Sequence, residues 1–256
     1  MLSTIQECWN YILCLLAHLL KQLMFTPTAE DPSLQLTYFD AEGLAEPVRR
    51  LLDYAGLEYR DERLTMDAFE ERKEHFPFGQ VPLLTVDGDV IAQSNAILRY
   101  VAKLGKTYPT RNHLNAAIVD MWCELHVECM TAITLNLYPD KFGLPDMDRA
   151  AHRDWCIRTH IPRYLQLLED DLQGPNSDTW LGGMDGVSVA DVCWYSTLET
   201  WFAGRFDGID SSTFGPYPML RAYIKDMAAQ LGEETVEDTQ QDTGGDEGAV
   251  EDNKED

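Results

Sequence analysis

Two short stretches in the first half of the chain could together bind and activate a thiol-bearing peptide. Tyr38 ends a β-prone run, where its hydroxyl could donate a hydrogen bond to a thiolate. Such a bond favours the charged form of sulfur and lowers the thiol pKa. Val81-Pro82 follows the turn Gly79-Gln80 and precedes a strand, where an X-Pro bond can be cis. Val81 would then expose backbone groups that could pair with a peptide as an added strand.

A third stretch, Gln93-Ser94, lies where a strand leads into a helix. The pattern predicts Ser94 as the N-cap, and the N-terminal N–H groups of the helix could bind an anion such as a carboxylate. Each of the three stretches also has an ordinary structural interpretation: a packed tyrosine, a loop proline and a plain helix cap. Their chemistry therefore depends on the elements that bring them together.

From Leu34 the apolar pattern predicts alternating strands and helices. The expected elements are a strand at Gln35–Phe39, a helix at Pro47–Ala55, a strand at Leu57–Leu64, a helix at Met66–His75, strands at Leu83–Val86 and Val90–Ala92 joined by Asp87-Gly88-Asp89, and a helix at Ser94–Leu104. This βαβαββα order is typical of a thioredoxin-like layer, in which helices cover a mixed sheet. Residues 34–106 are therefore predicted as an α/β domain.

After residue 106 the pattern becomes wholly helical. Apolar residues recur at helical spacing through 118–125, 161–168 and 192–198, which predicts an all-α bundle over residues 107–232. Ser188 and Asp191 are spaced as an acidic capping box, so one helix should begin sharply there. The fold class expected for the chain is α/β plus all-α.

The N-terminal extension and linker, residues 1–33, contain an apolar run from Trp9 to Phe25. His18 and Lys21 interrupt this run, which leaves it shorter than the roughly 18 residues of a spanning helix. No Lys or Arg precedes it, which argues against a secretory signal. A peripheral membrane anchor, a helix packed on the body and an over-extended gene model all stay open.

Charge and cysteine content exclude several functional classes. The formal charge of −24 over 256 residues disfavours nucleic-acid binding, because that needs clustered Lys and Arg. Residues 233–256 contribute eleven carboxylates and one lysine, so they carry −10 and predict a solvated, disordered acidic tail. The six cysteines form no C-x-x-C pair and no metal grouping, which predicts reduced thiols in the cytoplasm and no metal.

Five ordered blocks give the sequence a family resemblance. They are Leu36-Thr37-Tyr38-Phe39, Phe78-Gly79-Gln80-Val81-Pro82, Gln93-Ser94-Asn95-Ala96-Ile97-Leu98-Arg99-Tyr100, Ala117-Ile118-Val119-Asp120-Met121 and Trp180-Leu181-Gly182. Together they resemble the cytosolic glutathione S-transferases, and the pi and sigma classes above all. The resemblance covers about Leu34 to Leu231.

The resemblance implies roles for the residues that match family motifs. Tyr38 would stabilise the glutathione thiolate as the catalytic residue. The glutathione contacts implied besides Tyr38 are Val81 and Pro82 at the cysteinyl part, Gln93 and Ser94 at the γ-glutamyl end, and Phe69, Lys73 and Gln80 at the glycyl end. Glu128 would reach the glutathione of a partner subunit, which implies a homodimer. Phe39, Met130 and Tyr138 would line the electrophile site.

Two departures qualify the resemblance. Leu44 stands where the family has an arginine that supports the thiolate, and Phe69 stands where a tryptophan is common. Thiol activation should then depend more heavily on Tyr38. The predicted activity is a transferase of the EC 2.5.1.18 type, which conjugates glutathione to hydrophobic electrophiles in detoxification.

Two alternatives remain. The first is a non-catalytic scaffold that keeps the fold for protein interaction, because fold does not fix function. The second is prostaglandin isomerisation of the sigma type, although Leu135 occupies the place of that enzyme's tryptophan.

Overall fold

The computed structural model describes residues 32–174, 180–206 and 208–234 of the chain. The predicted N-terminal apolar run and the acidic tail beyond residue 234 lie outside these residues. From Leu34 onward the described residues belong to one compact unit. None of its helices is both long and apolar enough to span a membrane.

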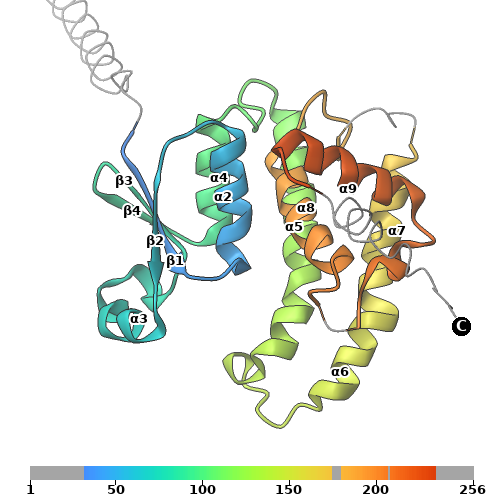
Figure 1. Ribbon diagram of the computed structural model, residues 1–256, viewed down its shortest axis with the longest axis horizontal. Helices are drawn as coiled ribbons and strands as arrows, with labels where there is room; N and C mark the ends of the chain where they lie inside the picture. The colour runs from blue at the N-terminus through green and yellow to red at the C-terminus, as the bar shows by residue number, and fades with distance from the viewer. Residues whose placement is uncertain (1–31, 175–179, 207, 235–256) are drawn as a thin grey trace, which may run out of the picture. The chain divides into compact units, whose positions relative to one another are not determined.

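A four-stranded mixed sheet forms the first half of this unit (Figure 1). The strands are β1 (Leu34–Phe39), β2 (Arg60–Leu64), β3 (Leu83–Val86) and β4 (Asp89–Ala92), in the spatial order β2-β1-β3-β4. β1 pairs with β2 in parallel and with β3 antiparallel, and β3 and β4 form a hairpin. The predicted thioredoxin-like order is confirmed.

Three helices accompany the sheet: α2 (Glu46–Tyr54), α3 (Met66–Arg72) and α4 (Ser94–Leu104). Short 3-10 turns at Gly43–Ala45, Lys73–His75 and Pro77–Gly79 link the elements. β2 begins at Arg60 rather than at the predicted Leu57, because the end of α2 uses the intervening residues. The Leu57 N–H donates back to the Leu52 carbonyl at 3.0 Å, and Gly56 adopts φ +64°. This left-handed closure makes a strand impossible at that point.

The second half is helical, as predicted. Its helices are α5 (His113–Leu137), α6 (Arg149–Trp155), α7 (Ile161–Leu172), α8 (Val189–Phe202) and α9 (Pro218–Leu231), with 3-10 turns at Pro139–Phe142 and Ser211–Phe214. A π-helical turn, Cys156–His160, joins α6 to α7 without a break. Pro162 has no N–H to donate to the Arg158 carbonyl, which accounts for the wider turn at this place.

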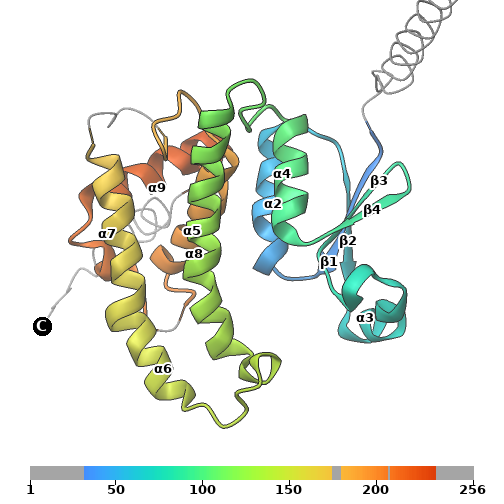
Figure 2. The same ribbon diagram turned by 180° about the vertical axis from the view of Figure 1, so that it is seen from behind.

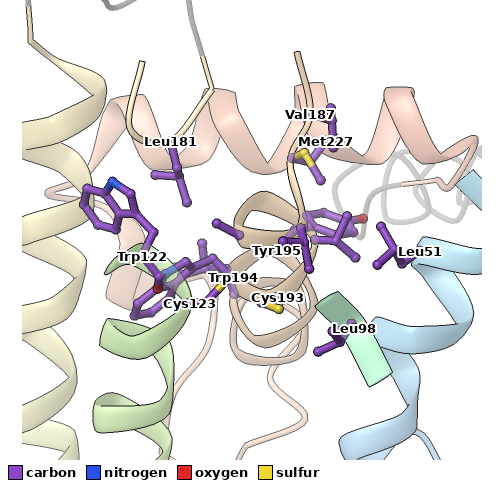
Figure 3. Packing of buried hydrophobic residues seen from close by; sticks show 14 of the residues in the cluster. Leu51, Leu98, Trp122, Cys123, Leu181, Val187, Cys193, Trp194, Tyr195 and Met227 are labelled. Atoms are coloured by element: carbon purple, nitrogen blue, oxygen red, sulfur yellow. Dashed lines mark hydrogen bonds between the residues drawn. The ribbon is translucent and has the colours of Figure 1, made fainter. Parts of the chain in front are cut away.

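α8 is the central helix of this half. Its apolar side chains are buried all round, and they include Val192, Trp194, Leu198 and Trp201. Figure 3 shows α8 between side chains from α5 on one side and Leu51 of α2 on the other. A helix that is hydrophobic on every face has to lie in a core. The turned view in Figure 2 shows α5 running alongside α2 and α4.

Two expectations about boundaries meet different outcomes. The capping box at Ser188 and Asp191 is confirmed, since both of its hydrogen bonds are present. The boundary before Glu233 falls too early. Glu233 accepts a hydrogen bond of 2.8 Å from Arg50 on α2 and another of 2.8 Å from the Tyr195 hydroxyl on α8. It therefore belongs to the folded unit rather than to the acidic tail.

Candidate active site

Strand register brings three of the predicted site residues to one end of the sheet. Thr37 pairs with Leu83 across β1 and β3, and Leu83 pairs with Ala92 across β3 and β4. One further residue along each strand places Tyr38, Pro82 and Gln93 in a row. Neighbouring strands lie about 5 Å apart, so the row is only about 10 Å long. The three stretches singled out in the sequence thus meet at one end of the sheet.

The Tyr38 hydroxyl is held by a backbone group of the following loop. The Leu44 N–H donates a hydrogen bond to Tyr38 Oη at 3.2 Å. The oxygen accepts this bond, which leaves the Tyr38 hydroxyl hydrogen available to donate elsewhere. In the sequence Leu44 stands out only as the place of a missing arginine. Its backbone role was missed, because any residue other than proline can supply an N–H.

Gly43 allows the loop to approach Tyr38 this closely. It adopts φ +44°, and a Cβ atom built on it would lie 2.6 Å from Tyr38 Oη. A side chain at this position would displace either the tyrosine or the loop. Glycine at 43 is therefore part of the site.

The pKa of Tyr38 lies above its ordinary value of 10.0. Burial of the hydroxyl is the main cause, and the charge of nearby Tyr138 adds to it. The Leu44 hydrogen bond and the positive charge of Arg49 act in the opposite direction. The hydroxyl therefore stays protonated at neutral pH and is a hydrogen-bond donor.

Arg49, on α2, holds the turn that follows Tyr38. Its guanidinium is buried and donates to the Ala41 carbonyl at 2.8 Å, the Phe39 carbonyl at 3.4 Å and Asp61 Oδ2 at 3.1 Å. These bonds hold both sides of the turn that follows Tyr38. An arginine in the first half of a predicted helix gave no sign of this role, which only the folded turn reveals.

The cysteinyl and γ-glutamyl positions have suitable backbone geometry. The Val81-Pro82 bond is cis, and Val81 lies outside the ladders of β3. Ser94 as N-cap was wrong: the N-cap residue is Gln93, at φ 74°, and Ser94 is the first helical residue. No side chain caps α4. Its first N–H groups therefore have no intrahelical partner and point out of the helix beside Gln93.

The predicted glycyl contacts form a less compact group. The Phe69 ring lies 5.1 Å from that of Phe39, edge to face, so these two aromatic residues connect α3 to the end of β1. Lys73 forms an ion pair with Glu70, and Gln80 is exposed. Their roles as glutathione contacts stay predictions.

The helical half contributes one side chain close to Tyr38. Tyr138, at the end of α5, lies near enough for its charge to raise the pKa of Tyr38, and Lys141 Nζ lies 4.5 Å from its ring centre. Met130 lies on the same helix, but its sulfur is 3.9 Å from the Thr197 hydroxyl of α8. A Met130 role in the electrophile site stays a prediction.

Glu128 is engaged within its own chain. Its Oε1 accepts a hydrogen bond of 2.7 Å from the Tyr164 hydroxyl and lies 3.7 Å from Arg163 Nη1. The predicted contact with a partner's glutathione is not tested by these bonds. In the described part of the chain, no group of three or more His, Cys, Asp or Glu side chains is arranged to hold a metal.

Comparison with known proteins agrees with this fold. A sequence model described as "Glutathione S-transferase, N-terminal domain" matches residues 34–103. The chain is 31% identical to Glutathione S-transferase 2 of Onchocerca volvulus over 198 residues, which are 76% of this chain and 87% of the relative. It is 46% identical to Hematopoietic prostaglandin D synthase of Gallus gallus over 194 residues, 75% of this chain and 88% of the relative.

A solved structure shows the same architecture. The pi-class glutathione S-transferase of Onchocerca volvulus superposes with a TM-score of 0.67 at 27% identity, covering 83% of this chain and 95% of that one. A thioredoxin-like sheet followed by a helical second half defines the class. The chain belongs to the glutathione S-transferase family.

Proposed function

We propose that the protein is a glutathione S-transferase that joins the glutathione thiolate to hydrophobic electrophiles. The observation that carries the proposal is the Tyr38 hydroxyl at the end of β1, which is protonated and accepts a hydrogen bond from the Leu44 N–H at 3.2 Å. A hydroxyl whose oxygen already accepts a bond is oriented to donate its hydrogen to a thiolate. This donation lowers the thiol pKa and increases the fraction of nucleophile at neutral pH.

The same end of the sheet has groups that could bind the rest of the tripeptide. The free backbone of Val81 suits pairing with the cysteinyl residue. The uncapped start of α4, next to Gln93, suits the γ-glutamyl carboxylate, because helix N-termini attract anions. Phe69, Lys73 and Gln80 are proposed for the glycyl end.

The reaction needs little beyond placement of the two reactants. The thiolate sulfur attacks an electrophilic carbon, a C–S bond forms, and either a leaving group departs with the bonding electrons or the resulting carbanion takes a proton from water. Phe39 and Tyr138 provide aromatic surface near Tyr38, and Met130 is proposed with them. Hydrophobic electrophiles fit such a surface.

The central test compares wild type with Tyr38→Phe. We expect glutathione affinity to change little, while the rate of conjugation to 1-chloro-2,4-dinitrobenzene falls by about 10- to 100-fold. The pKa read from the pH dependence of the rate should also rise. Tyr108→Phe is the matched control, because the Tyr108 hydroxyl bonds to Asp120 at 2.8 Å in the helical half. Tight glutathione binding with no Tyr38-dependent rate would leave the scaffold interpretation.

A second candidate is glutathione-dependent prostaglandin isomerisation. It is favoured by the 46% identity to the Gallus gallus synthase. Leu135 gives it no support from the predicted site. Incubation with a prostaglandin endoperoxide and glutathione would decide, since formation of prostaglandin D by wild type and not by Tyr38→Phe would establish this activity.

We also propose a cytoplasmic homodimer in which Glu128 reaches the partner's glutathione. The family resemblance and the partly exposed Glu128 carboxylate support it. Light scattering gives the oligomeric state, and Glu128→Gln should raise the KM for glutathione in a dimer. A monomer with an unchanged KM would contradict the proposal.

A further inference from the structure

The turn that follows α5 has a fixed backbone. Its residues, Pro139–Phe142, begin directly after Tyr138, and the Lys141 N–H donates to the Tyr138 carbonyl at 3.1 Å. Gly143 closes the turn at φ +71°. A glycine in the left-handed region ends a helical turn sharply. The direction of the Lys141 Cα–Cβ bond is therefore set by the backbone.

The Lys141 side chain ends over an aromatic ring next to Tyr38. Its Nζ atom lies 4.5 Å from the centre of the Tyr138 ring, within the range of a cation–π contact. Tyr138 is 51% exposed, so part of its ring is accessible to a ligand. After burial, the charge of Tyr138 adds to the rise in the Tyr38 pKa, which means that the two side chains lie close together. Tyr138 and then Lys141 therefore follow one another outward from the position proposed for the thiolate.

Among the described residues, no carboxylate forms an ion pair with the Lys141 ammonium group, and this includes Asp140, its neighbour in the turn. Lys73, by contrast, is paired with Glu70. The chain as a whole carries −24, which repels anionic compounds from most of its surface. An ammonium group without a carboxylate partner is therefore a local point of attraction for an anion at the outer end of the Tyr138 ring.

We infer that Lys141 selects electrophiles that carry a carboxylate: the apolar body of the electrophile lies along the Tyr138 ring, and its carboxylate contacts the Lys141 ammonium group. This inference rests on the proposed transferase function and names a substrate class for the same site. An ammonium–carboxylate contact is a charge-assisted hydrogen bond, and apolar surroundings strengthen it relative to water. Both residues belong to one chain, and neither is assigned above to a partner subunit.

The reaction of such a substrate follows the proposed chemistry. With an α,β-unsaturated ketone, the thiolate sulfur adds to the β-carbon and a C–S bond forms. The electrons of the carbon–carbon double bond move to give an enolate, which takes a proton from water, so no group leaves. The distant carboxylate keeps its charge throughout. Its attraction to Lys141 is the same in the bound substrate and in the transition state, which lowers KM and leaves kcat nearly unchanged. Lys141 is thus a specificity-determining residue.

The test uses two electrophiles that differ in one charge, para-carboxybenzylideneacetone and its methyl ester. Their aromatic ring separates the carboxyl group from the reacting carbon. The quantity compared is the ratio of kcat/KM for the acid to kcat/KM for the ester. Lys141→Met should lower this ratio about fivefold, through the KM for the acid, because one ion pair is lost. Lys141→Glu should lower it at least tenfold, because attraction becomes repulsion. Lys141→Arg keeps the charge and should stay within about twofold of wild type.

Lys103 provides the matched control, because its Nζ also lies over a tyrosine ring, 5.2 Å from the centre of Tyr108. Lys103→Met should leave the acid-to-ester ratio unchanged, and circular dichroism checks that every variant is folded. Equal ratios in wild type, Lys141→Met and Lys141→Glu would overturn the inference and leave the transferase proposal standing. Failure of wild type to conjugate either the ester or 1-chloro-2,4-dinitrobenzene would overturn the transferase proposal, and the inference with it.

Discussion

The loop that follows Tyr38, residues 40–45, and the segment at the start of α8, residues 180–191, are fixed in different ways. We call the second segment the Asp191 corner. Both must fix an irregular segment next to a regular element. At Tyr38 the loop is held by backbone bonds, by the Arg49 guanidinium beneath it and by an exposed ion pair from Glu42 to Arg205 at 3.8 Å. At the corner most of the side-chain hydrogen bonds converge on one buried carboxylate, that of Asp191.

Asp191 is fully buried and satisfies four donors. It accepts from the Leu181 N–H at 2.9 Å, the Ser188 N–H at 2.8 Å, the Ser188 hydroxyl at 2.7 Å and the Tyr223 hydroxyl at 3.0 Å. The corner thus concentrates its hydrogen bonds on one residue, whereas the site loop distributes small contributions over several groups. A segment that must admit a substrate is expected to be less tightly held.

The largest effect should come from breaking the corner. Asp191→Ala removes the acceptor for all four donors and leaves them buried, which should lower the free energy of unfolding by about 4 kcal/mol. Urea denaturation followed by fluorescence measures the change. Asp185→Ala, at an exposed position in the same segment, should change it by less than about 0.5 kcal/mol. Similar losses of unfolding free energy in both variants would show that the stability of the Asp191 corner does not depend mainly on Asp191.

A second test measures how the stability of the helical half depends on pH. Removal of water around His126, which bonds Thr197 at 2.8 Å, lowers its pKa from 6.5 to about 4. Between these two values the unfolded chain binds a proton that the folded chain does not. Stability should therefore fall as the pH drops from 6.5 to 4, by about 3 kcal/mol from this residue.

His126→Asn isolates this contribution from that of the carboxylates. Wild type should lose more stability than the variant between pH 7 and pH 4, and His75→Asn, at an exposed position, should behave as wild type does. Parallel pH curves for wild type and His126→Asn would rule the effect out.

Substitution in the loop after Tyr38 should lower the conjugation rate more than it lowers stability. Gly43→Ala forces a Cβ atom to 2.6 Å from Tyr38 Oη, which should reduce the conjugation rate by about tenfold and stability by about 1–2 kcal/mol. Gly56→Ala has a similar φ of +64° with no atom within 4 Å of the new Cβ. It should cost comparable stability with an unchanged rate. An equal rate loss in both would assign the effect to backbone strain alone.

The smallest effect is expected at the exposed ion pair. Arg205→Ala removes the contacts with Glu42 and Glu199, and should cost less than about 1 kcal/mol and change the conjugation rate by less than about twofold. Arg158→Ala removes an exposed pair with Asp154 at 2.5 Å and serves as the control. A rate loss near tenfold in Arg205→Ala alone would mean that the helical half controls the site loop.

Sequence patterns located the regular elements well, because period and turn chemistry are local. The helix Ser94–Leu104 and the strand Leu83–Val86 have the predicted bounds. β2 was placed three residues early, since Leu57 bonds back to α2 through a turn that an apolar residue does not announce. Serine is a common N-cap residue, which predicts a cap at Ser94, whereas the cap is Gln93, one residue earlier, with a positive φ.

Within the candidate site, the sequence indicates side chains and the backbone groups of Val81 and of the helix start, but not the contacts of the loop that covers Tyr38. Tyr38, Pro82 and Gln93 were found from motifs, and strand register then explained why they belong together. The Leu44 N–H, the close approach of Gly43 and the buried position of Arg49 depend on how one loop folds over Tyr38. No spacing of residue types encodes that arrangement.

The position of Glu233 has a practical consequence for shortened or tagged forms of the chain. A cut before this residue would strip Arg50 of its 2.8 Å partner and the Tyr195 hydroxyl of its acceptor, at the contact between α2 and α8. A cut after Glu234 keeps both. The acidity of the C-terminal region therefore misleads as a guide to trimming, and the useful end point for crystallisation or fusion is set by one glutamate that faces inward.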